Sequence, residues 1–134
     1  MDLNLSRELG ATQQPLAQRL TLYIPNKDER GTILADHEGW CREAQELLTA
    51  IGDGATAFPP VDGTWRRPDG GVLWEQTRII YTYVNPDKLV ANMTRLRRFL
   101  HRFGRQTNQG QVVFEFDGWF WSIDRYDAPE EQQQ

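Results

Sequence analysis

The segment Gly52–Glu75, GDGATAFPPVDGTWRRPDGGVLWE, holds three of the seven prolines and two of the five tryptophans, and the fold depends on how it turns the chain. Backbone geometry is most constrained here, because proline fixes one torsion and glycine enters regions that other residues avoid. A helical pattern precedes this stretch and a long strand pattern follows it. We expect it to contain a short irregular strand, a kink at Pro59–Pro60 and two turns, and so to aim the chain into a sheet.

Two patterns precede this stretch. Residues 19–24 alternate apolar and polar side chains, which predicts a strand with its two leucines and Ile24 on the core-facing side. Asp36 is a good N-cap for an amphipathic helix. We expect Gly52 to end that helix in the left-handed backbone region, which glycine enters at little cost.

The pattern after this stretch is a long strand over residues 72–84, rich in β-branched and aromatic side chains. Its second half, Ile79–Val84, is apolar on both faces, so we expect both faces to be covered. Its first half carries Glu75, Gln76 and Arg78, which favours a sheet edge or the side of a cleft.

A second helix is expected to begin after Asn85, an N-cap followed by Pro86 at the first helical position. Gly104 is expected to close it. Apolar side chains recur along it at spacings of four and three residues, which is typical of a helix with one face on a core: Leu89, Met93, Leu96, Leu100 and Phe103.

The C-terminal part supplies two more strands. Residues 111–116 alternate again, and Asp117-Gly118 is a two-residue hairpin signal that predicts antiparallel pairing of residues 119–123. The resulting order, β-α-β-β-α-β with one extra C-terminal strand, predicts an α+β fold: a ferredoxin-like sandwich of an antiparallel sheet with two helices on one face. We expect one domain over residues 19–125, a flexible N-terminal arm over residues 1–18 and a disordered tail over residues 126–134.

Size and composition indicate an ordinary globular protein. The chain has 134 residues, 39% hydrophobic and 25% charged, with a formal net charge of -4. A negative charge gives no general attraction to nucleic acid or to an anionic membrane, so we expect neither as a partner. The N-terminal residues lack the apolar core of a signal peptide, and we therefore expect a cytoplasmic location.

Few residues carry reactive side chains. Cys41 is the only cysteine, and a buried apolar role is favoured over that of a nucleophile. His37 and His101 fall on different predicted helices, so we expect no metal site. The glycines of Gly52–Gly54 follow a helix and precede a strand, the reverse of the order in nucleotide-binding loops, and we expect no cofactor.

Four arginines recur at spacings of three and four residues on the outer side of the second predicted helix: Arg95, Arg98, Arg102 and Arg105. Such a strip can dock on nucleic-acid phosphates. A charged outer face is also the ordinary state of a surface helix, and the negative net charge favours that second interpretation.

Four motifs in order resemble those of a family of small, uncharacterised bacterial domains: Trp40, D-G-x-T at residues 53–56, G-x-W-R at residues 63–66, and Glu75 at the start of a strand. The match spans roughly residues 20–116. Because the function of that family is unknown, the resemblance implies a fold and the position of a pocket, and no activity.

The residues on either side of the P-D-G-G turn are the candidate site. Pairing across this turn brings a tryptophan, a guanidinium and a carboxylate together, as small-molecule sites often do. The expected ligand-binding residues are Trp40, Trp65, Arg66, Trp74 and Glu75. Glu75 is also the candidate catalytic residue, since burial raises the pKa of a carboxyl group toward the range of a general base.

A structural interpretation of the same residues stays open. The tryptophans then pack in the core and at its rim, while Glu75 pairs with Arg66 or Arg78. In this interpretation Trp65 packs between the turn and the first helix. Gly63 is expected at positive φ in the turn.

Three functions are compatible with these patterns. The first is a binding domain that holds a small, partly aromatic or cationic ligand in a cleft beside Gly63–Glu75. The second is a small isomerase-like enzyme with Glu75 as its base and Arg66 steering an anion. The third is an interaction module: the sheet face without helices is rich in apolar side chains, and we expect a homodimer to form through it.

Overall fold

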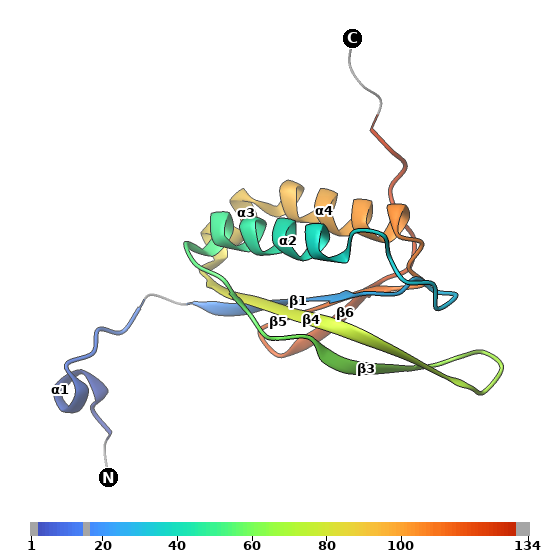
Figure 1. Ribbon diagram of the computed structural model, residues 1–134. Coiled ribbons are helices and arrows are strands. Elements are labelled where there is room, and N and C mark those ends of the chain that lie inside the picture. Colours follow the sequence, from blue (N-terminus) through green and yellow to red (C-terminus); the bar gives the residue numbers. More distant parts are fainter. Residues whose placement is uncertain (1–2, 15–16, 131–134) are drawn as a thin grey trace.

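A six-stranded antiparallel sheet with helices on one face forms the computed structural model of the protein, which describes residues 3–14 and 17–130 (Figure 1). The strands are β1 (Gln18–Pro25), β2 (Thr56–Ala57), β3 (Val61–Arg66), β4 (Val72–Val84), β5 (Val112–Phe116) and β6 (Trp119–Ile123). The helices are α1 (Leu5–Leu9), α2 (His37–Gly52), α3 (Pro86–Ala91) and α4 (Met93–Gln106). The strand order is β2-β4-β1-β5-β6, with β3 also paired to β4. This is the expected ferredoxin-like arrangement with β6 added at one edge.

Strand β1 lies at the centre of the sheet and connects its two halves. Leu22 is opposite Ile80 of β4 on one side and Phe114 of β5 on the other. Leu20, Leu22 and Ile24 are fully buried beneath the helices, as their alternation predicts. This register assigns the even-numbered residues of β4 to the helix-covered face and the odd-numbered residues to the helix-free face.

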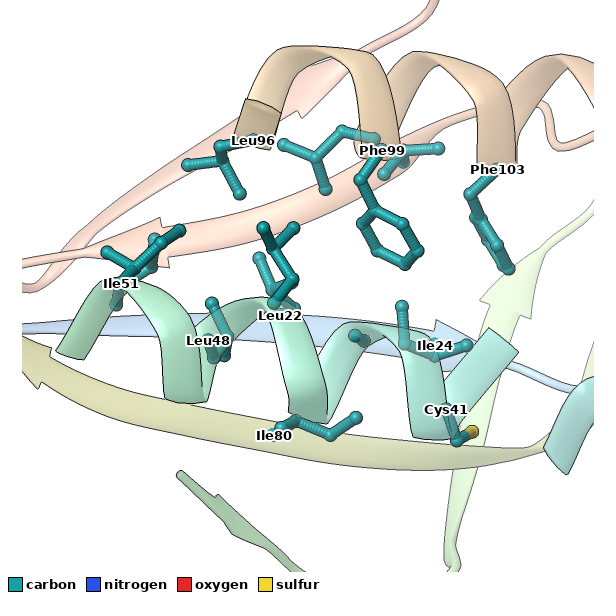
Figure 2. Close-up of a cluster of buried hydrophobic side chains, with 14 of the residues drawn as sticks. Leu22, Ile24, Cys41, Leu48, Ile51, Ile80, Leu96, Phe99 and Phe103 are labelled. Atoms are coloured by element: carbon teal, nitrogen blue, oxygen red, sulfur yellow. The ribbon is translucent and has the colours of Figure 1, made fainter. Parts of the chain in front are cut away.

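Helices α2 and α4 close the core over the sheet (Figure 2). Leu48 and Ile51 of α2 and Phe103 of α4 belong to one buried cluster, to which the sheet contributes Ile80. Burial of apolar surface is the main source of stability in such a layer. The core is therefore confined to one side of the sheet, and the other side is free to form a site.

The two ends of α2 differ from each other in how well the sequence predicts them. Asp36 caps the start, because its Oδ1 accepts a hydrogen bond of 3.2 Å from the backbone N–H of Gly39. The prediction for the other end is wrong: Asp53, with φ 68°, takes the left-handed conformation, and Gly52 is the last helical residue. Gly52 is required by packing instead, since a Cβ there would overlap the side chain of Thr82.

The second predicted helix is interrupted. Asn85 caps α3 with Pro86 at its first position, as predicted, but the helix breaks at Asn92 before α4 begins. The break turns Met93 outward, where it is 47% exposed, and Phe99 contributes to the core instead. The helix continues beyond the expected stop at Gly104 to Gln106, and Gly104 contacts the ring of Tyr126.

Strands β5 and β6 form the expected hairpin. Asp117 and Gly118 both have positive φ, 52° and 84°, as a two-residue turn of this type requires. The register of β6 places Trp119 and Trp121 on the helix side of the sheet and Phe120 on the other side. All three are exposed.

The two ends of the chain are held differently. Helix α1 buries none of its residues. The flexible arm expected over residues 1–18 stays a prediction, and its residues 1–2 and 15–16 lie outside the described residues. Residues 126–130 contact α4 through several hydrogen bonds and ion pairs, which differs from the expected disordered tail; residues 131–134 of that tail lie outside the described residues. Within the part of the chain that the structure describes, no helix is both long and apolar enough to cross a membrane.

Candidate functional site

A cavity of about 460 Å³ lies on the helix-free face of the sheet, where the β3–β4 hairpin extends beyond the helices (Figure 1). Four segments line it: β1 with the loop that follows it, β3 with its turn, the first half of β4, and the segment that leads into β5. Tyr23, Leu73, Ile79 and Val113 give it apolar walls. A concave, mostly apolar site with a few polar groups is the usual form of a small-molecule site.

Glu75 is the most buried carboxylate on the wall of this cavity, with 6% of its surface exposed. The indole Nε1–H of Trp65 donates a hydrogen bond to its Oε1. Gly63 lies directly opposite Glu75 in the ladder, and a Cβ at Gly63 would be 3.3 Å from Cγ of Glu75 and 3.1 Å from Oγ1 of Thr77. Gly63 is not at positive φ, so that expectation is wrong; the close approach of the Glu75 side chain is what favours glycine there.

The environment of Glu75 shifts the pKa of its carboxyl group. Burial raises the pKa of the Glu75 carboxyl above its usual value, because desolvation disfavours the charged form. The hydrogen bond from Trp65, the charge of Lys27 and the hydroxyl of Thr77 act in the opposite direction and are weaker. A carboxyl group with a raised pKa beside an open cavity has the properties required of a ligand anchor or a general base.

Tyr23 supplies the second polar group of the cavity. Its hydroxyl donates a hydrogen bond of 2.6 Å to Oε1 of Glu115 on the neighbouring strand β5. Burial, reinforced by Glu115, raises the pKa of Tyr23 to about 12, so the phenol stays neutral near pH 7. The cavity therefore combines a neutral hydroxyl group with the Glu75 carboxyl group.

The structure brings together only part of the predicted ligand-binding set. Trp65, Arg66 and Glu75 line the cavity. Trp40 lies in the helix layer, with its ring 5.2 Å from that of Phe103, and Trp74 points to the opposite side of the sheet, where it is 61% exposed. Neither Trp40 nor Trp74 is among the lining residues, because the sheet separates them from the cavity.

The structural role expected for Trp65 is also wrong. Its side chain is 42% exposed and lies on the helix-free face, so it does not pack against the first long helix. Its contact with Glu75 makes it part of the candidate site.

Several lining residues were not identified from the sequence. Tyr23 had a usable signal, because the alternation in β1 places it on the helix-free face, opposite Ile79. No sequence signal marked three other lining residues: Asp28 and Glu29 of the loop after β1, and Gln109 before β5. They reach the cavity through loop geometry that has no periodic pattern.

Cys41 and His37 lie one turn apart on α2. Burial raises the pKa of the Cys41 thiol to about 11, which keeps it protonated, although its Sγ lies 3.3 Å from Nε2 of His37. Cys41 thus fits the predicted role of a small buried residue. The described residues contain no group of three or more His, Cys, Asp or Glu side chains that could hold a metal ion.

The arginines on the outer side of α4 are partly neutralised by carboxylates. Arg98 pairs with Glu130 at 2.7 Å, and Arg102 pairs with Glu43 of α2. Arg97 makes a two-point contact with Asp127 at 2.8 and 2.9 Å. That this face does not dock on nucleic-acid phosphates stays a prediction.

Comparisons with known proteins identify similar folds. No family model matches the chain, and no curated protein matches it. A phage SAM lyase in complex with S-methyl-5'-thioadenosine is similar in structure, with a TM-score of 0.56 and 11% sequence identity, over 86% of this chain and 97% of that chain. The same kind of enzyme in its apo state gives a TM-score of 0.54 and 12% identity, over 89% and 100% of the two chains.

A more distant similarity is to CutA from Synechococcus elongatus, with a TM-score of 0.42 and 14% identity, over 68% of this chain and 72% of that chain. At these identities the similarity to the SAM lyase establishes the fold alone. The resemblance to the uncharacterised bacterial family stays a prediction.

Proposed function

We propose that this protein binds a small molecule in the cavity beside the β3–β4 hairpin, and that the ligand carries a cationic or hydrogen-bond-donating group next to a flat apolar part. The observation that carries the proposal is Glu75, a carboxyl group buried in the wall of an open cavity. An ionisable group is costly to bury, and an incoming cation or donor would offset that cost.

The charges around the cavity favour a ligand with a positive group. The carboxylates of Glu29 and Glu75 line it, whereas that of Asp28 accepts two backbone hydrogen bonds from its own loop. Arg66 and Arg67 lie at the hairpin side. A zwitterionic ligand would place its cation at Glu75 and its anion at these arginines.

The apolar walls suit a planar group. The Trp65 indole offers an aromatic face, and Tyr23 and Val113 lie on the sheet floor. Aromatic rings bind flat ligands and cations through their faces, in addition to the surface that they bury. The hydrogen bond to Glu75 fixes the indole in place before a ligand arrives.

SAM and S-methyl-5'-thioadenosine are the first probes to test. The similar phage enzyme is a SAM lyase, and one of its structures holds S-methyl-5'-thioadenosine. The shared fold supplies only this choice of probe. SAM combines a planar base, a sulfonium cation and a carboxylate, which are the features that the cavity favours.

Isothermal titration calorimetry tests the proposal with the wild type, Glu75→Gln and Glu46→Gln. Glu46 is an exposed carboxylate on α2, away from the cavity, and is a matched control. We expect SAM to bind the wild type and Glu46→Gln equally, and Glu75→Gln about tenfold or more weakly, because hydrogen bonds to charged groups contribute about 1.5–3 kcal/mol. If neither probe binds the wild type, or if Glu75→Gln binds SAM as tightly as the wild type, the proposal is wrong for this ligand class.

An enzyme with Glu75 as general base is the second candidate. It is favoured by the raised pKa of Glu75, which brings its protonation nearer to working pH. Incubation of each bound probe with wild type and Glu75→Gln, followed by NMR of the small molecules, separates binding from turnover. If Glu75 is the general base, the wild type should convert the probe to a product and Glu75→Gln should not.

We also propose that a second copy of the chain covers the aromatic row on the helix-free face beside the cavity. Phe58, Tyr81 and Tyr83 follow one another there, with ring centroids 5.6 and 5.9 Å apart, and Tyr83 is 57% exposed. An exposed row of this kind commonly marks an interface. Sedimentation at micromolar concentration should give a dimer for the wild type and a monomer for Tyr83→Glu. A monomeric wild type would contradict this part of the proposal.

A further inference from the structure

The C-terminal segment Tyr126–Glu130 has no regular secondary structure, yet hydrogen bonds and ion pairs bind it to α4. Asp127 accepts hydrogen bonds from Arg97, and its backbone N–H donates to Nδ1 of His101 at 2.8 Å. The backbone carbonyl of Asp127 accepts from Arg105 at 2.6 Å. These contacts fix the position of the segment next to Tyr126.

The ring of Tyr126 packs against α4 at a position where glycine leaves room for it. Gly104 of α4 has no Cβ, and any Cβ there would overlap the Tyr126 ring. The ring meets His101 edge to face, with centroids 6.2 Å apart. The Tyr126 hydroxyl donates a hydrogen bond of 2.9 Å to the backbone carbonyl of Gln109.

Gln109 links this contact to the cavity. It is buried and lines the cavity, and its side-chain amide donates to the carbonyl of Lys27 at 2.9 Å. The neighbouring carbonyl of Asn108 accepts a hydrogen bond of 3.0 Å from the backbone of Glu29, another lining residue. The two loops that form this wall are therefore hydrogen-bonded to each other. Tyr126 is hydrogen-bonded to one of them, through the carbonyl of Gln109.

We propose that Tyr126 is a positioning residue, which fixes the loop at residues 107–111 and through it the loop at residues 26–31, so that both keep the shape of the ligand-binding wall. This inference rests on the proposed function, because the wall matters to binding only if the cavity holds a ligand. The exposed ion pairs of the segment contribute little energy by themselves. Their role is to keep Tyr126 in place.

Amide hydrogen exchange of wild type, Tyr126→Phe and Thr49→Val tests the positioning without any ligand. Tyr126→Phe keeps the ring on Gly104 and removes only the hydroxyl donor. Thr49→Val is the matched control, because it removes an exposed hydroxyl on α2 that also donates to a backbone carbonyl, that of Gln45 at 2.8 Å. We expect exchange at residues 26–31 and 107–111 to become about three- to tenfold faster in Tyr126→Phe only, with the core strands unchanged. Unchanged exchange in both loops overturns the proposal.

Calorimetric titration of the same proteins with S-methyl-5'-thioadenosine tests the consequence. Tyr126→Phe should bind about three- to tenfold more weakly than wild type and Thr49→Val. Looser loops with unchanged affinity overturn the positioning role. If the wild type does not bind this probe, the proposed function fails for it, while the exchange comparison still decides whether Tyr126 holds the wall.

Gly104→Ala provides an independent check, because its Cβ displaces the Tyr126 ring while the hydroxyl group remains. If this variant folds, its loops should exchange at least as fast as those of Tyr126→Phe. Protected loops in a folded Gly104→Ala overturn the proposal.

Discussion

The two halves of strand β4 bury opposite faces. In the half that begins at Ile80, the even-numbered Ile80, Thr82 and Val84 are buried beneath the helices, while Tyr83 on the other face is exposed. In the half that begins at Val72, the odd-numbered Leu73, Glu75 and Thr77 are buried, although no helix covers their face. The switch occurs at Arg78 and Ile79, which are both half-buried.

One strand can therefore contribute to the stability of the core and to a site at the same time. Side chains alternate between the two faces of a strand, so a change in what covers the sheet changes which residues are buried. The second half contributes to the core of the sandwich. The first half passes beyond the helices, and its buried side chains contact the hairpin and the loops around the cavity.

The largest expected effect is in the core half. Ile80→Ala should lower the free energy of unfolding by about 2–5 kcal/mol, because it leaves a void in a close-packed layer. Leu73→Ala should cost less, since Leu73 already borders open space in the cavity. Urea unfolding of both variants checks this contrast, and equal losses at the two positions would contradict it.

Replacement of Glu75 should give a smaller and pH-dependent effect. Because the folded-state pKa of Glu75 lies above its unfolded value of about 4.3, charging this group costs more in the folded protein than in the unfolded chain. The stability of the wild type relative to Glu75→Gln should therefore be highest below that unfolded value and should fall as pH rises through the folded-state pKa. Unfolding curves for both proteins between pH 4 and 8 measure this difference; a wild type that gains stability relative to Glu75→Gln over that range would show that the direction is wrong.

Trp65→Phe should have a weaker effect on stability. It keeps an aromatic ring and removes the indole donor to Glu75, for which we expect a loss of about 0.5–1.5 kcal/mol. The same change removes an interaction that lowers the pKa of Glu75, so the pH dependence described above should move to higher pH. An unshifted pH dependence would argue against this hydrogen bond.

Trp74→Thr should have the smallest effect. Trp74 belongs to the same half-strand as Glu75, but it points to the opposite side of the sheet and is largely exposed. We expect a change in stability within about 0.5 kcal/mol and unaltered binding to the cavity. A large loss of binding would show that the sheet does not separate Trp74 from the site.

The elements that make up the sandwich were predictable because each depends on local patterns. The alternation in residues 19–24, the caps at Asp36 and Asn85, and the turn at Asp117-Gly118 all act through neighbouring residues. The ferredoxin-like order followed from their sequence. For the first half of β4 the polar residues left two possibilities open, a sheet edge or the side of a cleft, and its buried side chains lie at the cavity.

The site was only partly predictable because its members come from distant segments. Trp65 and Glu75 were found together since a single turn separates their strands. Trp74 was grouped with them by proximity in sequence and Trp40 through the resemblance to the bacterial family. Neither argument shows on which side of the sheet a ring lies. Gly52, Gly63 and Gly104 were all interpreted by backbone conformation. In the structure a neighbouring side chain leaves no room for a Cβ at Gly52 and Gly104, and a close approach favours glycine at Gly63.

The central position of β1 has a consequence for synthesis of the chain. This strand leaves the ribosome first among the strands, but both of its neighbours, β4 and β5, come from the second half of the sequence. The pairing of Leu20 is complete only after Thr82, its partner on one side, and Phe116, its partner on the other, have been synthesised. Such distant pairings slow folding, because a long loop must close before either contact forms. A chain synthesised only as far as β4 would leave the backbone N–H and C=O groups of β1 unpaired along the edge that β5 later occupies, and such an open edge can pair with another chain.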